Sequence, residues 1–203
     1  PAVLDFGYTE IPWTLAEATS SNDIMFVERS SAQAIATAFG AGDARSTLGI
    51  HSNGDAWWGG LYLTGPSAGA THHGDDWSQN AELARFTYNV YQGPDNATVP
   101  LGVNGSNLSH GAGHSLTLSD RPELRVDDTT FLSTGAMPID SGNVLGGEAA
   151  ATYGNFYMDG EYFHYNVDRR EGLSDVGFNG GYAEASYSFG GHRKYNPGAG
   201  GYT

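Results

Sequence analysis

The sequence predicts an all-β, antiparallel fold whose strands separate two different environments. The stretch from Gly146 to Phe189 alternates with a period of two, which is typical of β-strands. Its apolar positions are Leu145, Ala149, Ala151, Tyr153, Phe156, Met158, Tyr162, Ala183, Ala185, Tyr187 and Phe189, and its polar positions are Glu148, Thr152, Asp159, Glu161, Glu184, Ser186 and Ser188. Glycine supplies 30 of the 203 residues and aromatic residues 12%, which favours strands and tight turns over helices.

Two architectures can satisfy such alternation. A soluble β-sandwich buries the apolar face in a dry core, whereas an outer-membrane barrel turns that face towards lipid and the polar face towards a wet lumen. No run of about 18 apolar residues occurs, so the sequence predicts no membrane-spanning helix.

The N-terminal part combines strands with an inserted segment. Ala2 to Tyr8 predicts a strand that Pro12 ends, because proline cannot donate to a sheet. Near residues 19–40 we expect a short helix or folded loop, with Ser20 to Asp23 as its N-cap region. Asn53-Gly54 then predicts a tight hairpin, because both central residues of such a turn need positive φ.

The remaining chain predicts further strands in succession and one domain over residues 1–203. We expect strands at 81–92, 98–108 and 115–126, a long polar connection at 127–142, and three strands beyond it, with a turn at Gly154-Asn155 and a loop at 169–175. This gives about eight or nine strands joined by alternating short turns and longer loops, with no βαβ rhythm.

The overall charge excludes one large class of partners. The formal net charge is −14, with nine Lys and Arg against 23 Asp and Glu. Nucleic acid needs clustered positive charge, so we expect no nucleic-acid partner. Cysteine is absent, so the fold must hold together without disulfides.

Three segments resemble the phosphate-selective porin O and P family. They are Ser20 to Ser30, which reads SSNDIMFVERS; Ser119 to Arg125 with Ser133-Thr134-Gly135 after it; and Gly180 to Pro197, which begins GGYAEASY and continues to HRKYNP. The three occur in the order that the family has. The resemblance implies a bacterial outer-membrane porin, an antiparallel transmembrane β-barrel.

The resemblance also implies how such a barrel would be assembled. Family members are large barrels that usually form trimers, so we expect this chain to supply about half of a larger, 16-stranded barrel. Its partners would be outer-membrane lipid, further copies in a homotrimer, and small hydrophilic solutes such as phosphate or other inorganic anions. We expect passive diffusion, no enzyme activity and no cofactor.

Four arginines are candidates for anion binding in the pore: Arg29, Arg85, Arg121 and Arg125. Arg85 shares a strand face with Thr87 and Asn89, and an arginine in a narrow pore attracts anions. Alternatively, Arg85 pairs with Glu82 or a carboxylate of a neighbouring strand. Arg121 and Arg125 flank Glu123, so they can form a pore ladder or a structural salt-bridge network, and Arg29 can narrow the pore or tie a loop to the wall.

The carboxylates Glu148, Asp159, Glu161 and Glu184 are expected to line the lumen. Carboxylates that point into the lumen repel anions, so this acidic wall conflicts with the anion selectivity that the resemblance implies. Many aromatic residues lie towards strand ends and are expected to form interface girdles: Trp57, Trp58, Tyr62, Tyr88, Tyr91, Tyr153, Tyr157, Tyr162, Tyr165, Tyr187 and Phe189.

Three other functions compete with the porin hypothesis. Asp159 and Glu161 could serve as the paired carboxylates of a glycoside hydrolase. His72, His73, Asp75 and Asp76 lie in one loop and could bind a metal, although a solvated loop is the favoured interpretation. A secreted carbohydrate-binding sandwich is the main alternative, and detergent dependence distinguishes it from a porin.

Overall fold

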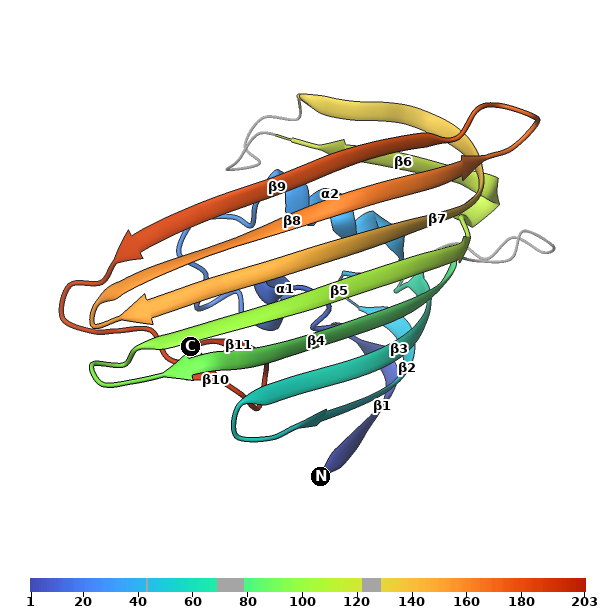
Figure 1. The fold of residues 1–203 in the computed structure, drawn as a ribbon. Coiled ribbons are helices and arrows are strands. Elements are labelled where there is room, and N and C mark those ends of the chain that lie inside the picture. The colour runs from blue at the N-terminus through green and yellow to red at the C-terminus, as the bar shows by residue number, and fades with distance from the viewer. Residues whose placement is uncertain (43, 69–78, 122–128) are drawn as a thin grey trace.

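The computed structural model describes residues 1–42, 44–68, 79–121 and 129–203, and one antiparallel sheet dominates it (Figure 1). Its strands are β1 (Ala2–Thr9), β2 (Arg45–Asn53), β3 (Trp57–Ser67), β4 (Asn80–Gln92), β5 (Thr98–His110), β6 (Ser115–Asp120), β7 (Leu132–Tyr153), β8 (Phe156–Arg169) and β9 (Val176–Tyr187). The order is β1-β2-β3-β4-β5-β7-β8-β9, and β6 pairs with β7. Among these described strands β1 and β9 are edges, so the sheet is not closed into a barrel.

The predicted alternation is present in every long strand. Along β4 and β8, buried and exposed side chains succeed one another almost without exception. The exposed side is apolar: Leu145 is 65% exposed and Met158 57%. Glu148 and Glu161, on the opposite side, are only 6% and 3% exposed. The apolar side chains are therefore outside and many charged ones are inside.

Short segments cover the inner face of the sheet. They are α1 (Leu15–Ala18), α2 (Ser31–Ala36), the 3₁₀ helix η1 (Thr37–Phe39), and a small hairpin of β10 (Tyr195–Asn196) and β11 (Gly201–Tyr202), whereas the 3₁₀ helix η2 (Ala112–His114) connects β5 to β6. Figure 1 shows α1 and α2 behind the sheet, with the β10–β11 hairpin beside the ends of β4 and β5.

None of the described helices is long and apolar enough to cross a membrane.

The core lies between the sheet and the covering segments. Trp13 and Phe39 of the segment between β1 and β2 are fully buried against inward-facing residues of the strands, which include Phe163 and Tyr165. Burying such rings stabilises the fold by roughly 1.5–3 kcal/mol each. The Trp13 indole also donates to the backbone carbonyl of Gly105, 2.9 Å away on β5. This segment is therefore packed against the wall.

The turns confirm two of the predicted hairpins but change the geometry of one. Gly154 has φ +57 in the β7–β8 turn, as a tight turn there requires. The β2–β3 hairpin exists, but neither Asn53 nor Gly54 adopts positive φ, and Asn53 pairs with Trp58 inside the ladder. The loop is thus the three residues 54–56, and the expected Asn-Gly turn type is wrong.

Two further expectations need correction. Ser20 to Asp23 forms a turn, closed by a hydrogen bond from Asp23 N to Ser20 O, and is not an N-cap. Instead Thr14 caps α1 and Ser30 caps α2. The predicted polar connection at 127–142 is also wrong from residue 132 onward, because β7 begins at Leu132 and pairs there with β6. The polar composition of residues 132–142 concealed this part of the strand.

Candidate membrane surface and inner wall

The outer face of the sheet carries a continuous band of apolar side chains. It includes exposed residues of eight strands: Leu4, Phe6, Leu48, Ile50, Leu61, Leu63, Phe86, Tyr88, Val90, Leu101, Val103, Leu145, Tyr153, Phe156, Met158, Tyr162 and Tyr187. A monomer in water rarely exposes a contiguous apolar patch of more than a few hundred Å². This face therefore needs an apolar environment.

The border of this band runs obliquely to the rows of paired residues. In one row the first three side chains are apolar and the last four polar: Phe6, Leu48, Leu63, Glu82, Asn107, Asn143 and Asn166. The next row towards the short turns becomes polar only at its last two members: Leu4, Ile50, Leu61, Ala84, Gly105, Leu145, His164 and Asn179. A flat membrane that meets strands tilted by about 35–45° requires such a shift.

The polar side chains beyond the border bind one another. Asn107 donates to Glu82 over 2.8 Å, and Asn166 donates to Asn143 over 3.2 Å. His164 and Asn179 lie 2.6 Å apart. These pairs follow the longer-loop side of the sheet, where they are suited to a wet interface.

The aromatic girdle prediction is partly wrong. Rings do gather outside at the short-turn ends of the strands, and Phe156 and Tyr187 meet edge to face at 4.7 Å. However, Trp58, Tyr62, Tyr157 and Tyr165 are at most 4% exposed and point inward. Tyr162 is exposed but lies within the band. Position near a strand end did not reveal which face each ring occupies.

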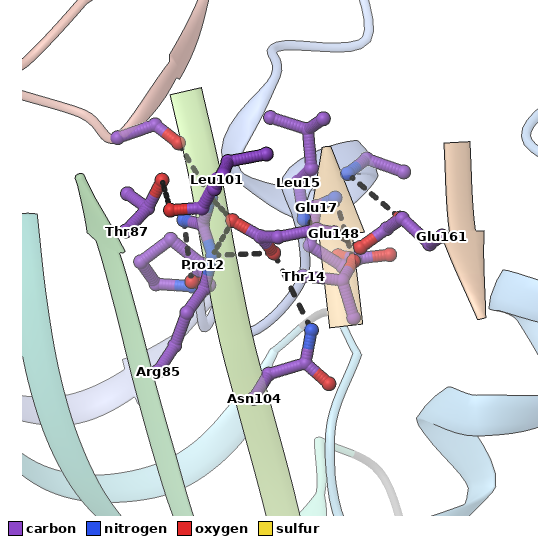
Figure 2. Close-up of polar contacts among 12 residues, drawn as sticks. Pro12, Thr14, Leu15, Glu17, Arg85, Thr87, Leu101, Asn104, Glu148 and Glu161 are labelled. Atoms are coloured by element: carbon purple, nitrogen blue, oxygen red, sulfur yellow. Dashed lines mark hydrogen bonds and ion pairs between the residues drawn. The ribbon is translucent and has the colours of Figure 1, made fainter. Parts of the chain in front are cut away.

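Arg85 and Glu148 form a buried ion pair on the inner face (Figure 2). The Arg85 Nη2 lies 2.7 Å from Glu148 Oε1, and its Nε donates to both carboxylate oxygens. Arg85 also donates to the carbonyls of Pro12 and Gly200 and lies over the Trp58 ring at 5.3 Å. The alternative that Arg85 pairs with a carboxylate is correct, but the partner is neither Glu82 nor on an adjacent strand.

Gly102 explains how this pair spans a strand. Glu148 is on β7 and Arg85 on β4, with β5 between them. Gly102 pairs with both Thr87 and Glu148, and a Cβ there would lie 2.5 Å from Glu148 Oε1 and 2.8 Å from its Cγ and Cδ. The missing side chain thus leaves the space through which Glu148 reaches Arg85.

Glu161 anchors the first turn of α1. Its Oε1 accepts from Leu15 N at 2.9 Å, and its Oε2 accepts from Ala16 N at 3.3 Å and from the Tyr182 hydroxyl at 2.8 Å. The first N–H groups of a helix have no intrahelical acceptor, so a carboxylate there is stabilising. Glu161 therefore holds the covering segment to the wall.

Asp159 and Glu184 lie further along the same inner face. They are paired across β8 and β9, and the Tyr182 hydroxyl lies 3.4 Å from Asp159 Oδ2. Asp159 is 8% exposed and Glu184 is half-buried at the sheet edge. All four carboxylates of the predicted lumen wall thus face inward, but three of them are sealed beneath other segments.

The other arginine candidates have different surroundings. Arg29 donates to the carbonyls of Ala16 and Thr19 and lies 3.9 Å from carboxylates of both Glu10 and Glu17. These partners lie in residues 10–19, so Arg29 ties the covering segment together and not, as one sequence alternative had it, a loop to the wall. Arg121 is exposed at the end of β6. Glu123 and Arg125 lie outside the described residues, so the pore ladder or salt-bridge network expected of Arg121, Glu123 and Arg125 stays a prediction.

The C-terminal segment also packs against the wall, which sequence analysis did not anticipate. Tyr202 is buried, meets Tyr157 edge to face at 4.7 Å and lies 3.3 Å from the Thr98 hydroxyl. Burial raises the pKa of the Tyr202 hydroxyl, so this group stays protonated and can donate. Arg193 stacks over the Tyr157 ring at 4.6 Å. The only sequence signal was the cluster of aromatic and basic residues after the last strand.

The geometry gives the competing sites little support. Glu161 has its hydrogen-bonding oxygens occupied and is almost inaccessible, so a hydrolase using Asp159 and Glu161 lacks an open cleft at Glu161. The metal-loop candidates His72, His73, Asp75 and Asp76 lie outside the described residues.

Comparison with known proteins places this geometry in a family. A family model described as phosphate-selective porin O and P matches residues 1–202. No curated protein matches the chain. The match covers nearly the whole chain and favours a channel over a carbohydrate-binding module.

Proposed function

Because the chain belongs to the phosphate-selective porin O and P family of bacterial outer-membrane channels, we propose that it admits small hydrophilic solutes by passive diffusion. Porins are channels and not enzymes. The sheet is then a section of barrel wall, with lipid against its apolar face and the lumen on the side of α1 and α2. The oblique apolar band carries this proposal, since a tilted-strand barrel requires such a border.

The two edge strands bear on how the barrel is completed. Exposed backbone edges are not tolerated in hydrocarbon, so β1 and β9 need partner strands in the membrane. We propose that residues 1–203 form one barrel domain with its insert near 19–40, that further strands complete a barrel of about 16 strands, and that three copies form a trimer.

Extraction and conductance test the proposal. The purified protein is expected to require detergent, to shift in mobility when heated before electrophoresis, and to give discrete conductance steps in a planar lipid bilayer. A protein that stays monodisperse without detergent and gives no steps would contradict it. Binding to polysaccharide under those conditions would favour the secreted module instead.

A further inference from the structure

A groove crosses the apolar band on the outer face of β3, β4 and β5, which lie side by side (Figure 1). Two adjoining hollows form it, with volumes of about 800 Å³ and 580 Å³, and both are lined by Leu61, Ala84, Gly105 and Leu145. The largely exposed side chains of Leu61 and Leu145 form its walls. Ala84 and Gly105 lie between them in the same row and are too short to fill the space.

The floor of the groove is inclined to the strands. It leads from Asn107 on β5 through Ala84 on β4 to Gly59 on β3, so each step of two residues towards the short turns also moves across by one strand. With about 3.4 Å per residue and about 4.8 Å between strands, this path lies at about 35° to the strand direction.

This inclination aligns the groove with the membrane normal. Barrel strands themselves tilt by about 35–45° from the barrel axis. Towards the short turns, the apolar border shifts from β4 to β8, whereas the groove runs from β5 to β3. The groove therefore crosses the border instead of following it, and it has the direction in which lipid acyl chains lie.

The length of the groove matches one leaflet. Its two inclined steps from Asn107 to Gly59 span about 17 Å, which is about half of the roughly 30 Å hydrocarbon core. The groove thus begins at the border of the apolar band and ends near the bilayer midplane. An acyl chain that enters from one membrane surface has this reach.

The end at the longer-loop side is polar. It is lined by Glu82, Asn107 and Asn143. Asn107 donates to the Glu82 carboxylate over 2.8 Å, and the Ser109 hydroxyl donates to it over 3.0 Å. Amide, hydroxyl and carboxylate groups all hydrogen-bond with sugar hydroxyls. Among the described residues that line this hollow there is no lysine or arginine, so its polar end suits a sugar better than a phosphate.

We propose that this groove binds one acyl chain of lipopolysaccharide, with the acylated sugar against Glu82, Asn107 and Asn143. In outer-membrane barrels the longer loops are extracellular, and the extracellular leaflet is built from this glycolipid. The inference rests on the proposed porin function, because it requires the apolar face to lie in the outer membrane. It assigns a specific lipid site to one part of that face.

Gly105→Leu fills the groove and tests the site. A Cβ at Gly105 would lie 3.5 Å from Val144 O and 4.0 Å from Leu145 Cδ1, which are ordinary contacts, so the new side chain can extend into the groove without displacing the backbone. Gly147→Leu is the matched control. It adds the same side chain to the outer face of the adjacent strand β7, outside the groove, where a Cβ meets no described atom within 4 Å. The heat-modifiable band shows whether each variant folds.

Native mass spectrometry of the detergent-solubilised protein, titrated with deep-rough lipopolysaccharide, measures binding. The unmodified protein and Gly147→Leu are expected to bind it equally. Gly105→Leu is expected to bind about tenfold more weakly, because the loss of about two buried methylene groups corresponds to this factor. Equal binding by the two variants would overturn the site. Equal or tighter binding of phosphatidylethanolamine by the unmodified protein would overturn the choice of glycolipid.

Two further outcomes separate this site from other roles. If Gly105→Leu dissociates an oligomer and leaves lipid binding unchanged, the groove is a subunit interface and the proposal fails. Conductance of the unmodified protein in a planar bilayer tests the porin function independently. Conductance steps together with equal binding by the two variants would overturn the lipid site alone, whereas glycolipid binding that depends on Gly105 without any steps would contradict the channel alone.

Discussion

At the residue scale, Arg85 illustrates how a charged side chain can serve structure inside a pore protein. Its guanidinium group is flanked by Glu148, two carbonyls and the Trp58 ring. Removing two charges from water costs several kcal/mol each, and this cost is offset only by good geometry and further hydrogen bonds. Arg85 meets both conditions, so its role is to join β4, β7 and the two covering segments.

Glu148→Gln is expected to lower the free energy of unfolding by about 3 kcal/mol, because it leaves the Arg85 charge buried without a counter-charge. Urea titration of the folded protein in detergent, followed by tryptophan fluorescence, measures the change. The control is Glu171→Gln in the exposed β8–β9 loop, which is expected to cost less than about 0.5 kcal/mol.

The double variant Arg85→Met with Glu148→Leu separates charge from packing. It is expected to recover much of the lost stability, because an apolar pair of similar volume avoids the unpaired charge. If Glu148→Gln behaved like the loop control, Arg85 would have to be neutralised by another group.

The sequence allowed only part of this site to be predicted. Alternation placed Arg85 and Glu148 on the inner side of their strands, since a period of two separates the faces. It could not pair them, because strand neighbours are known only once the register and the β5–β7 contact are fixed. It also could not show that Gly200, at the opposite end of the chain, would accept from Arg85.

At the element scale, the covering segments explain why the inner wall is dry. Isolated helices as short as α1 and α2 are marginal in water. They exist here because wall groups complete them: Glu161 accepts from the first turn of α1, and the Tyr165 hydroxyl donates to Ala32 O of α2. Helices this short leave no periodic pattern, so the sequence predicted only a folded region near 19–40, which contains α2, and it did not reveal α1 at Leu15–Ala18.

Gly102→Ala is expected to destabilise the sheet by about 1–3 kcal/mol, because its Cβ would overlap the Glu148 side chain and displace it from Arg85. Gly147→Ala is the matched control: it lies on the neighbouring strand β7, faces outward, and its Cβ meets no atom within 4 Å. The urea midpoints of the two variants provide the comparison. Equal midpoints would mean that Glu148 can reach Arg85 by another route.

At the scale of the whole molecule, the sequence predicted that the strands have one apolar and one polar face, but it did not predict what covers each face. The alternating residues of β7, β8 and β9 showed an apolar face and a polar face, and the structure confirms both. The inner face was expected to be wet, yet Trp13, Phe39 and Tyr202 cover much of it. Periodicity describes which side chains share a face but not which distant segment packs on that face.

The oblique border gives a prediction about membrane insertion. On β7 the outward apolar positions run from Leu145 to Tyr153, with Ala149 at their centre and Asn143 beyond the border. Ala149→Arg is expected to make folding into lipid vesicles less favourable by about 2–4 kcal/mol, because it places a charge at the bilayer midplane. The folded fraction at each urea concentration, read from the heat-modifiable band on a gel, measures this change.

Asn143→Arg is the control on the same strand and the same face. It lies in the row of Asn107 and Asn166, where the side chains are polar, so the expected cost is about 0–1 kcal/mol. The row that contains Asn143 on β7 also contains Leu63 on β3, and Leu63 lies inside the apolar band. Leu63→Arg should therefore cost more than Asn143→Arg although the two positions share a row. Equal costs would mean that the membrane border follows the rows, and the strands would then not be tilted.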